Sequence, residues 1–134
     1  MTIAIRFATV MIFAAGAGIV ASPAHAQETA PASKASPGQA AFNNHCRTCH
    51  TVKKGDNRLG PSLGGIVGAK AGANSGYAAY SQAMKSSGVV WDEATLDRFI
   101  ADPESVVPNN NMKPFKGVPD AAVRKAIVDY MKSG

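Results

Sequence analysis

The sequence contains few of the side chains from which proteins build a closed metal site: two cysteines and three histidines in 134 residues. A structural zinc ion requires four ligands, usually from two spaced pairs. Beyond Cys46, Cys49 and His50, the chain after its N-terminal region offers only His45. Because His45 adjoins Cys46, it is badly placed to complete a tetrahedron with the other three. A shortage of ligands therefore disfavours a zinc site.

Runs that alternate apolar and polar residues, as half-buried strands do, are also missing. A Cys-x-x-Cys pair that works as a redox disulfide is expected near a βαβ unit, so this absence disfavours a thiol–disulfide module. Aromatic residues make up only 7% of the chain, and the basic residues are spread among acidic ones. Nucleic acid is therefore not expected as a partner.

The apolar run near the N-terminus, residues 7–20, is shorter than the roughly 20 residues that a membrane-spanning helix needs. Arg6 precedes this run, and Ala24-His25-Ala26 fits the small-x-small rule for cleavage. These features predict a secretory signal peptide over residues 1–26, cleaved after Ala26, and hence a periplasmic protein with no stable membrane insertion. An uncleaved N-terminal anchor is the alternative interpretation.

Residues 27–36 are rich in Ala, Pro and Ser and have no periodic apolar face, which indicates a flexible leader. Residues 37–134 then form one small domain, without internal repeats. A domain of this size buries only a modest fraction of its surface and often needs a metal or cofactor to stabilise it.

The most informative motif is Cys46-Arg47-Thr48-Cys49-His50. In a helical turn, positions i, i+3 and i+4 share one face, so both thiols and the imidazole point the same way. Cys-x-x-Cys-His is the attachment motif of a c-type haem, in which the thiols form thioethers and the histidine binds iron. The motif therefore predicts one covalent haem, with a disulfide or another metal as the less favoured alternatives.

Local signals place the expected helices. Ser36, Pro37 and Gln39 form an N-cap, N1 and capping-box pattern that starts a helix running into the attachment turn. Residues 51–76 are glycine-rich and predict a long loop wrapped around a haem edge. Residues 77–85 and 92–101 are expected to be helices, and Asp102-Pro103 to end the second.

After an irregular segment at residues 108–119, Pro119 is expected at N1 of a C-terminal helix. The apolar face of this helix would contain Val123, Ile127, Tyr130 and Met131. The predicted architecture is thus all-α, with three main helices, short helices and long loops around the haem.

Three methionines, Met84, Met112 and Met131, could supply a second axial ligand. Met131 lies on the apolar face of the last helix, and Met84 lies in a short helix where packing explains it. Met112 lies between prolines, in a loop where helical packing cannot explain it, and its thioether is a soft ligand. We therefore expect His50 and Met112 to be the metal ligands, with an open sixth site as the alternative.

With these motifs, the chain resembles class I cytochrome c, in its mitochondrial and bacterial c2-like branch. The likeness runs from Gly38 to Tyr130. It rests on Gly38, Phe42 and Tyr130 at a helix crossing, Cys46-x-x-Cys49-His50-Thr51-Val52, Gly60-Pro61-x-Leu63, Trp91, Leu96, Asp102-Pro103 and Pro108-x-x-x-Met112.

The resemblance implies cofactor-binding roles for four more residues. The Pro61 carbonyl would accept the N–H of His50, Leu63 would pack on the haem, and Trp91 and Tyr80 would lie on the propionate side. The chain also departs from the mitochondrial pattern. Phe99 replaces a tyrosine near the distal sulfur. Glu104, Ser105 and Asn111 stand where that branch has lysines.

The resemblance further implies a monomeric one-electron carrier, not an enzyme, that shuttles between Fe(III) and Fe(II). Its partners would be a quinol–cytochrome c reductase, a terminal oxidase or a photosynthetic reaction centre. The chain is basic, with a net charge of +5, and Lys53, Lys54, Lys113 and Lys116 are expected near an exposed haem edge where partners dock. A haem enzyme or a gas sensor with an open sixth site is the alternative.

Overall fold

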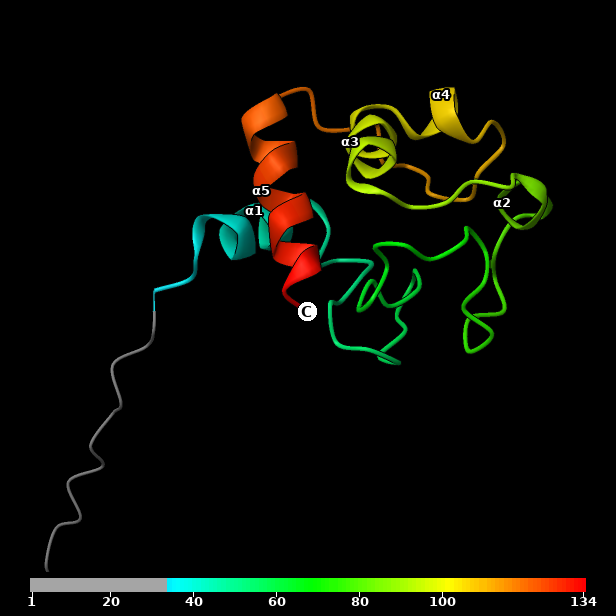
Figure 1. Cartoon of the computed structure of the whole chain (residues 1–134), viewed down its shortest axis with the longest axis horizontal. Coiled ribbons are helices and arrows are strands. Elements are labelled where there is room, and N and C mark those ends of the chain that lie inside the picture. Colours follow the sequence, from blue (N-terminus) through cyan, green and yellow to red (C-terminus); the bar gives the residue numbers. More distant parts are fainter. Residues whose placement is uncertain (1–33) are drawn as a thin grey trace, which may run out of the picture. The chain divides into compact units, whose positions relative to one another are not determined.

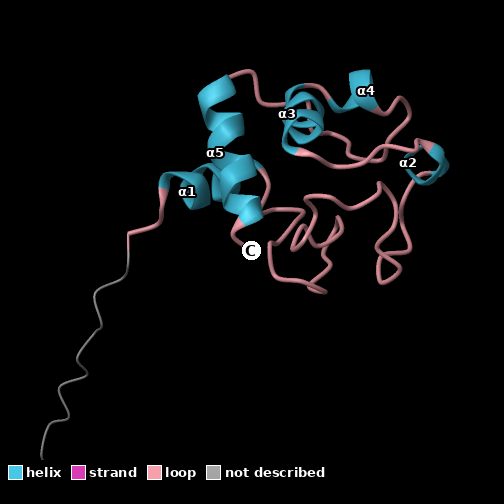
Figure 2. Ribbon diagram, viewed as in Figure 1, coloured by secondary structure: helices cyan, strands magenta, loops and turns pink. Residues whose placement is uncertain are grey.

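The computed structural model describes residues 34–134, so the signal peptide predicted over residues 1–26 and most of the leader predicted over residues 27–36 lie outside the described part. The described residues form five helices and no β-strand (Figure 2). The helices are α1 (Pro37–His45), α2 (Gln82–Ser86), α3 (Glu93–Ala101), α4 (Pro103–Val106) and α5 (Ala121–Lys132). Long loops connect them, and the all-α prediction is confirmed.

The first and last helices, α1 and α5, cross in close contact (Figure 1). Gly38 makes the close approach possible, because a Cβ there would lie 2.6 Å from the backbone oxygen of Ala126. Next to the crossing, the rings of Phe42 and Tyr130 pack with their centroids 5.4 Å apart. The crossing predicted from Gly38, Phe42 and Tyr130 is therefore present.

The side chain of the preceding residue determines where most helices start. Ser36 accepts the N–H of Gln39 at 3.1 Å, so α1 begins at Pro37 as predicted. Asp92 accepts the N–H of Thr95 at 2.7 Å, which places the start of α3 one residue after the predicted one.

Two predicted starts were wrong. The helix expected over residues 77–85 begins only at Gln82, because Ser81 caps it and the hydroxyl of Tyr77 donates to the carbonyl of Leu59. Pro119 lies before the cap rather than at N1, since Asp120 accepts the first N–H groups of α5. The short helix α4, which starts at Pro103, was not predicted.

The hydrophobic core lies where α3 and α5 meet α1 and the loops. Its most buried side chains are Ile127 and Val118. Arg124 ties α5 to α3: its guanidinium donates to both carboxylate oxygens of Asp97, at 2.8 and 3.4 Å. It also donates to the carbonyls of Val118 and Pro119, which hold the loop before α5 in place.

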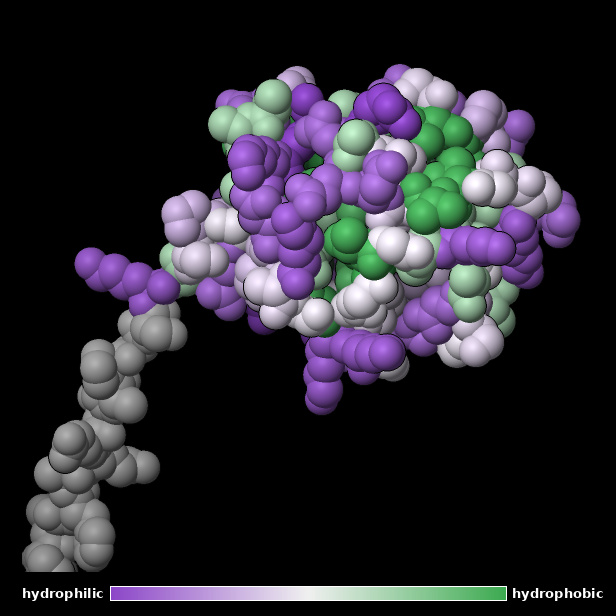
Figure 3. Space-filling view, viewed as in Figure 1, coloured by the Kyte–Doolittle hydropathy of each residue, from purple (hydrophilic) through white to green (hydrophobic). Residues whose placement is uncertain are grey.

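Hydrophilic side chains cover much of the visible face, and the most apolar ones form patches between α3 and α2 and below α3 in this view (Figure 3). Within residues 34–134, no helix has both the length and the apolar character needed to cross a membrane.

Candidate haem-binding site

The attachment motif forms a single turn directly after α1. The N–H groups of Cys49 and His50 both donate to the carbonyl of Cys46, at 3.1 and 2.9 Å. This turn gives the three side chains the i, i+3, i+4 relation that the sequence predicted. Both cysteines are free thiols; Cys46 is buried and Cys49 is half-buried.

His50 is oriented by a backbone carbonyl. Its Nδ1 lies 2.7 Å from the carbonyl oxygen of Pro61, and the side chain is buried. Because a carbonyl can only accept, Nδ1 carries the proton and the lone pair of a neutral ring is on Nε2. Burial lowers the pKa of His50, and the bond to Pro61 opposes that effect. The ring is thus a neutral imidazole with Nε2 available to a metal.

Gly60 forms one wall of this arrangement. A Cβ at Gly60 would lie 2.3 Å from Cε1 of His50 and 2.7 Å from its Nδ1. Only a glycine therefore allows the imidazole to lie against this stretch of backbone. The sequence analysis noted Gly60 as part of a motif but missed this contact, for which a glycine directly before the orienting proline is the one available signal.

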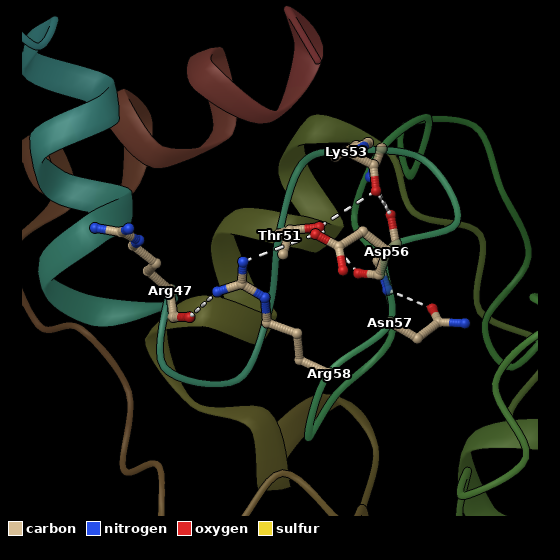
Figure 4. Close-up of polar contacts among 8 residues, drawn as sticks. Arg47, Thr51, Lys53, Asp56, Asn57 and Arg58 are labelled. Atoms are coloured by element: carbon tan, nitrogen blue, oxygen red, sulfur yellow. Dashed lines mark hydrogen bonds and ion pairs between the residues drawn. The ribbon is translucent and has the colours of Figure 1, made fainter.

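The loop after the attachment turn is held by internal polar contacts (Figure 4). Thr51 Oγ1 donates to the carbonyls of Lys53 and Asp56, and Arg58 donates to the carbonyl of Arg47.

Asn57 connects this loop to the next one. Its amide oxygen accepts the N–H of Ser62, directly after Pro61, at 2.8 Å. Its amide nitrogen donates to the carbonyl of Gly76 at 2.9 Å. These contacts fix the carbonyl that orients His50.

The four further residues predicted to bind the cofactor come from two loops, the one between α1 and α2 and the one between α2 and α3. Pro61 reaches His50, as described, and Leu63 is half-buried against the core. Trp91 is only 5% exposed, and its ring packs on that of Phe99 with centroids 4.8 Å apart. Tyr80 is half-buried, with its ring edge-to-face on a neighbouring tyrosine, and burial raises its pKa.

Two backbone hydrogen bonds position Trp91. Its N–H donates to the carbonyl of Ala69, and its own carbonyl accepts the N–H of Gly68. The glycine-rich loop and the segment before α3 are therefore paired at this point, although only one isolated bridge, between Lys70 and Val90, forms there. The long loop predicted over residues 51–76 is thus ordered by contacts with distant segments.

Met112 lies in the irregular segment between α4 and α5, as predicted. Its side chain is half-buried against the core. Its N–H donates to Oδ1 of Asn110 at 2.8 Å, and the side chain of Asn111 donates to the carbonyl of Ala79. Asn109 has a φ of 61°, a left-handed conformation that asparagine tolerates better than most residues. These contacts fix the backbone that carries the thioether.

The residues present fit a haem better than the alternative sites. Among the described residues, no group of three or more His, Cys, Asp or Glu side chains could hold a metal ion, which leaves no closed zinc site there. Burial, with a smaller effect of the neighbouring Cys49, raises the pKa of Cys46 to about 12. A thiol that stays protonated is a poor nucleophile for disulfide exchange. Two free thiols that can form thioether bonds and a neutral imidazole that can bind iron are the groups that haem c requires.

Comparisons with known proteins agree with this geometry. The family model described as cytochrome c matches residues 35–134. Cytochrome c2 iso-2 of Magnetospirillum molischianum is 43% identical over 88 residues, covering 66% of this chain and 89% of that protein. Cytochrome c of Tetrahymena pyriformis is 38% identical over 111 residues, covering 83% of this chain and 98% of that protein.

A solved structure shows the same fold. Cytochrome cH from Methylobacterium extorquens superposes with a TM-score of 0.67 at 42% identity, and the match covers 75% of this chain and 98% of that one. The sequence resemblance is therefore confirmed. The chain belongs to the cytochrome c family as a class I, c2-like member, an electron-transfer protein with covalent haem c rather than an enzyme.

Proposed function

We propose that this protein is a periplasmic one-electron carrier with a single haem c, attached through Cys46 and Cys49 and ligated by His50 and Met112. The observation that carries this proposal is the 2.7 Å contact between Nδ1 of His50 and the carbonyl of Pro61. With Nδ1 committed to that carbonyl, the one strong donor left on the ring, Nε2, is free for iron.

Bound haem would supply a one-electron Fe(III)/Fe(II) couple, which His/Met ligation suits to electron transfer. The chain's own residues then keep both ligands in place. Pro61 fixes the orientation of His50 and increases its basicity. Asn110 fixes the backbone of Met112. Ligands that barely move when the charge changes favour rapid transfer.

Three other residues would line the haem. We assign Leu63 to apolar contact with it, and Trp91 and Tyr80 to the propionate side. Phe99 packs on Trp91 and has no hydroxyl, so it cannot donate a hydrogen bond to the sulfur of Met112. This difference from a tyrosine acts on the electron density at the thioether, and therefore on the reduction potential.

We place the protein in the periplasm on the basis of the signal peptide predicted over residues 1–26. There it would act as a monomer that carries electrons between membrane complexes. The candidates are a quinol–cytochrome c reductase as donor and a terminal oxidase or photosynthetic reaction centre as acceptor. Carriers of this kind bind partners briefly through small, charged interfaces.

The docking surface would include the lysines near the attachment and Met112 loops. Lys53, Lys54, Lys113 and Lys116 are all exposed. An acidic partner would be attracted over roughly the 10 Å Debye length of a 0.1 M salt solution. The rate of electron transfer to the membrane complexes should therefore fall as salt is added. A rate that does not change with salt would eliminate this docking mode.

Optical spectra of the protein matured with haem test the ligand assignment. Met112→Ala should abolish the weak near-red absorption of a ferric haem–thioether bond, and should allow carbon monoxide to bind the reduced protein rapidly. Met84→Ala removes the same side chain from α2 and serves as the matched control, with a spectrum like that of the wild type. An unchanged ferric spectrum in Met112→Ala would refute the assignment. Acid–acetone extraction that removes the colour would refute covalent attachment.

A further inference from the structure

The carboxylate of Glu104 closes the loop that carries Met112. Glu104 lies in the first turn of α4. Its Oε1 accepts the backbone N–H of Asn109 at 2.7 Å, and its Oε2 accepts the amide N–H of Asn110 at 3.0 Å. Both carboxylate oxygens are thus directed at the turn that follows α4, which lies to the right of α4 in Figure 1, before the chain runs back toward α5.

Asn110 transmits this contact to Met112. Its side chain is buried, with 4% of the residue exposed, and its amide nitrogen also donates to the carbonyl of Val107 at 3.0 Å. Its amide oxygen accepts the N–H of Met112 at 2.8 Å. Because a carboxylate only accepts hydrogen bonds, Glu104 forces the NH₂ group toward itself and the oxygen toward Met112.

We propose that Glu104 is a positioning residue for Met112: through Asn110 it holds the Met112 loop closed and slows the departure of the thioether from iron. This inference rests on the proposed function, because it takes Met112 to be the axial ligand. It also assigns a role to a carboxylate that the sequence analysis recorded only as a replacement for a lysine.

Glu104 supplies the charged acceptor at the near end of this loop, where Asn110 also donates to the carbonyl of Val107. Helix α4 has four residues, and Asn109 holds a left-handed φ of 61°. The ammonium of Lys113 is 4.0 Å from Oε2 of Glu104 and largely exposed, so it adds little. Hydrogen bonds to a carboxylate such as that of Glu104 are roughly twice as strong as hydrogen bonds between two neutral groups.

The test measures how often the loop opens in the ferric, haem-loaded protein. Exogenous imidazole can bind only after Met112 leaves the iron, so its rate of binding at saturating concentration reports the opening rate. Glu104→Ala loses both hydrogen bonds, and Glu104→Gln keeps one acceptor oxygen while its NH₂ group opposes a donor. We expect the saturating rate to rise about 10- to 100-fold in Glu104→Ala and by a smaller factor in Glu104→Gln.

Glu93 provides the matched control. It lies in the first turn of α3, it is about as exposed as Glu104, and it pairs with Lys132 at 2.6 Å. Glu93→Ala and Glu93→Gln remove the same charge from the same type of position without touching the Met112 loop. Their imidazole rates should equal that of the wild type. Denaturant unfolding of all four variants separates global destabilisation from local opening, because a merely structural role would change only the former.

The outcomes distinguish this inference from the proposal on which it rests. If Met112→Ala keeps the thioether absorption, the ligand assignment fails, and the role of Glu104 fails with it. If Met112→Ala loses that absorption but Glu104→Ala binds imidazole at the wild-type rate, the ligand assignment stands and only the role of Glu104 is refuted. Equal acceleration in the Glu93 variants would also refute it.

Discussion

Replacing Gly60 with alanine tests the geometry that orients His50. The new Cβ would lie 2.3 Å from Cε1 of the imidazole and 2.8 Å from Nε2. Ordinary contacts of a methyl group with a ring begin at about 3.4 Å or more, so the ring or the loop must move by about 1 Å. A displacement of that size lengthens the 2.7 Å contact between Nδ1 and the carbonyl of Pro61 beyond hydrogen-bonding distance.

The expected loss of stability follows from three effects. Breaking a hydrogen bond between buried groups costs about 1–3 kcal/mol. Overpacking costs about 1–3 kcal/mol. Replacing glycine reduces the entropy of the unfolded chain and returns about 0.4–1 kcal/mol. The net destabilisation should therefore be about 2–4 kcal/mol, which for a domain of about 100 residues lowers the melting temperature by about 10–20 °C.

Guanidinium unfolding of the haem-loaded variant measures this effect, and the NMR signal of the Nδ1 proton reports the bond to Pro61. Gly76→Ala is the control, because a Cβ there would come no closer than 3.3 Å to the side chains of Asn57 and Asn74. The control should lose less than about 1 kcal/mol. A Gly60→Ala protein as stable as the control, with an unshifted Nδ1 signal, would show that Gly60 does not confine the ring.

Three further changes test other parts of the structure. Gly38→Ala should lower the urea midpoint, because its Cβ would lie 2.6 Å from the backbone oxygen of Ala126 in α5. This clash should outweigh the helix propensity of alanine, which exceeds that of glycine by about 1 kcal/mol. A higher midpoint would contradict the close crossing of α1 and α5. Arg124→Met should cost about 2 kcal/mol in thermal unfolding, because it leaves Asp97 and two carbonyls without their donor. The hydrogen bond from the Thr95 N–H lowers the pKa of Asp92, so Asp92 stabilises the fold above its unfolded pKa and loses this effect as pH falls through its folded pKa. Asp92→Asn keeps an acceptor at the cap and should flatten the decline of stability below about pH 4, as measured by unfolding midpoints at several pH values.

Features determined by neighbouring residues could be predicted from the sequence. The start of α1 depends on Ser36 and Gln39, and the attachment turn depends on the spacing of Cys46, Cys49 and His50. In each case, the interacting groups lie within five residues of one another. Local chemistry is therefore enough to predict the conformation.

Features determined by contacts between distant segments could not be predicted in this way. Residues 77–81 have a composition compatible with a helix, but the hydroxyl of Tyr77 donates to the carbonyl of Leu59, 18 residues earlier, and the segment forms no helix. The contact of Gly60 with His50 likewise arises only when the loop returns to the attachment turn. Tertiary contacts of this kind override local propensity.

The hydrogen bonds of Glu104 were missed for a different reason. They span only five and six residues, but they depend on the left-handed turn at Asn109, which no periodic pattern announces. The sequence analysis recorded Glu104 only as a lost lysine, because a charge at a surface position is usually just solvated. The available signal was the run of asparagines a few residues after this carboxylate. Asparagine suits such turns, because its amide can form local hydrogen bonds and its backbone tolerates positive φ.

The two sides of the site are held in physically different ways. On the His50 side, a buried imidazole lies between a glycine backbone and a carbonyl, so moving it requires shifting packed atoms. On the Met112 side, the loop depends on hydrogen bonds that pass through Glu104, a side chain that is half exposed. Water can replace those bonds one at a time, whereas it cannot relieve a steric contact. Under the proposed ligand assignment, ligand exchange should therefore occur by loss of Met112 while His50 remains bound. The same assignment implies that electron transfer with both ligands bound requires the Met112 loop to stay closed.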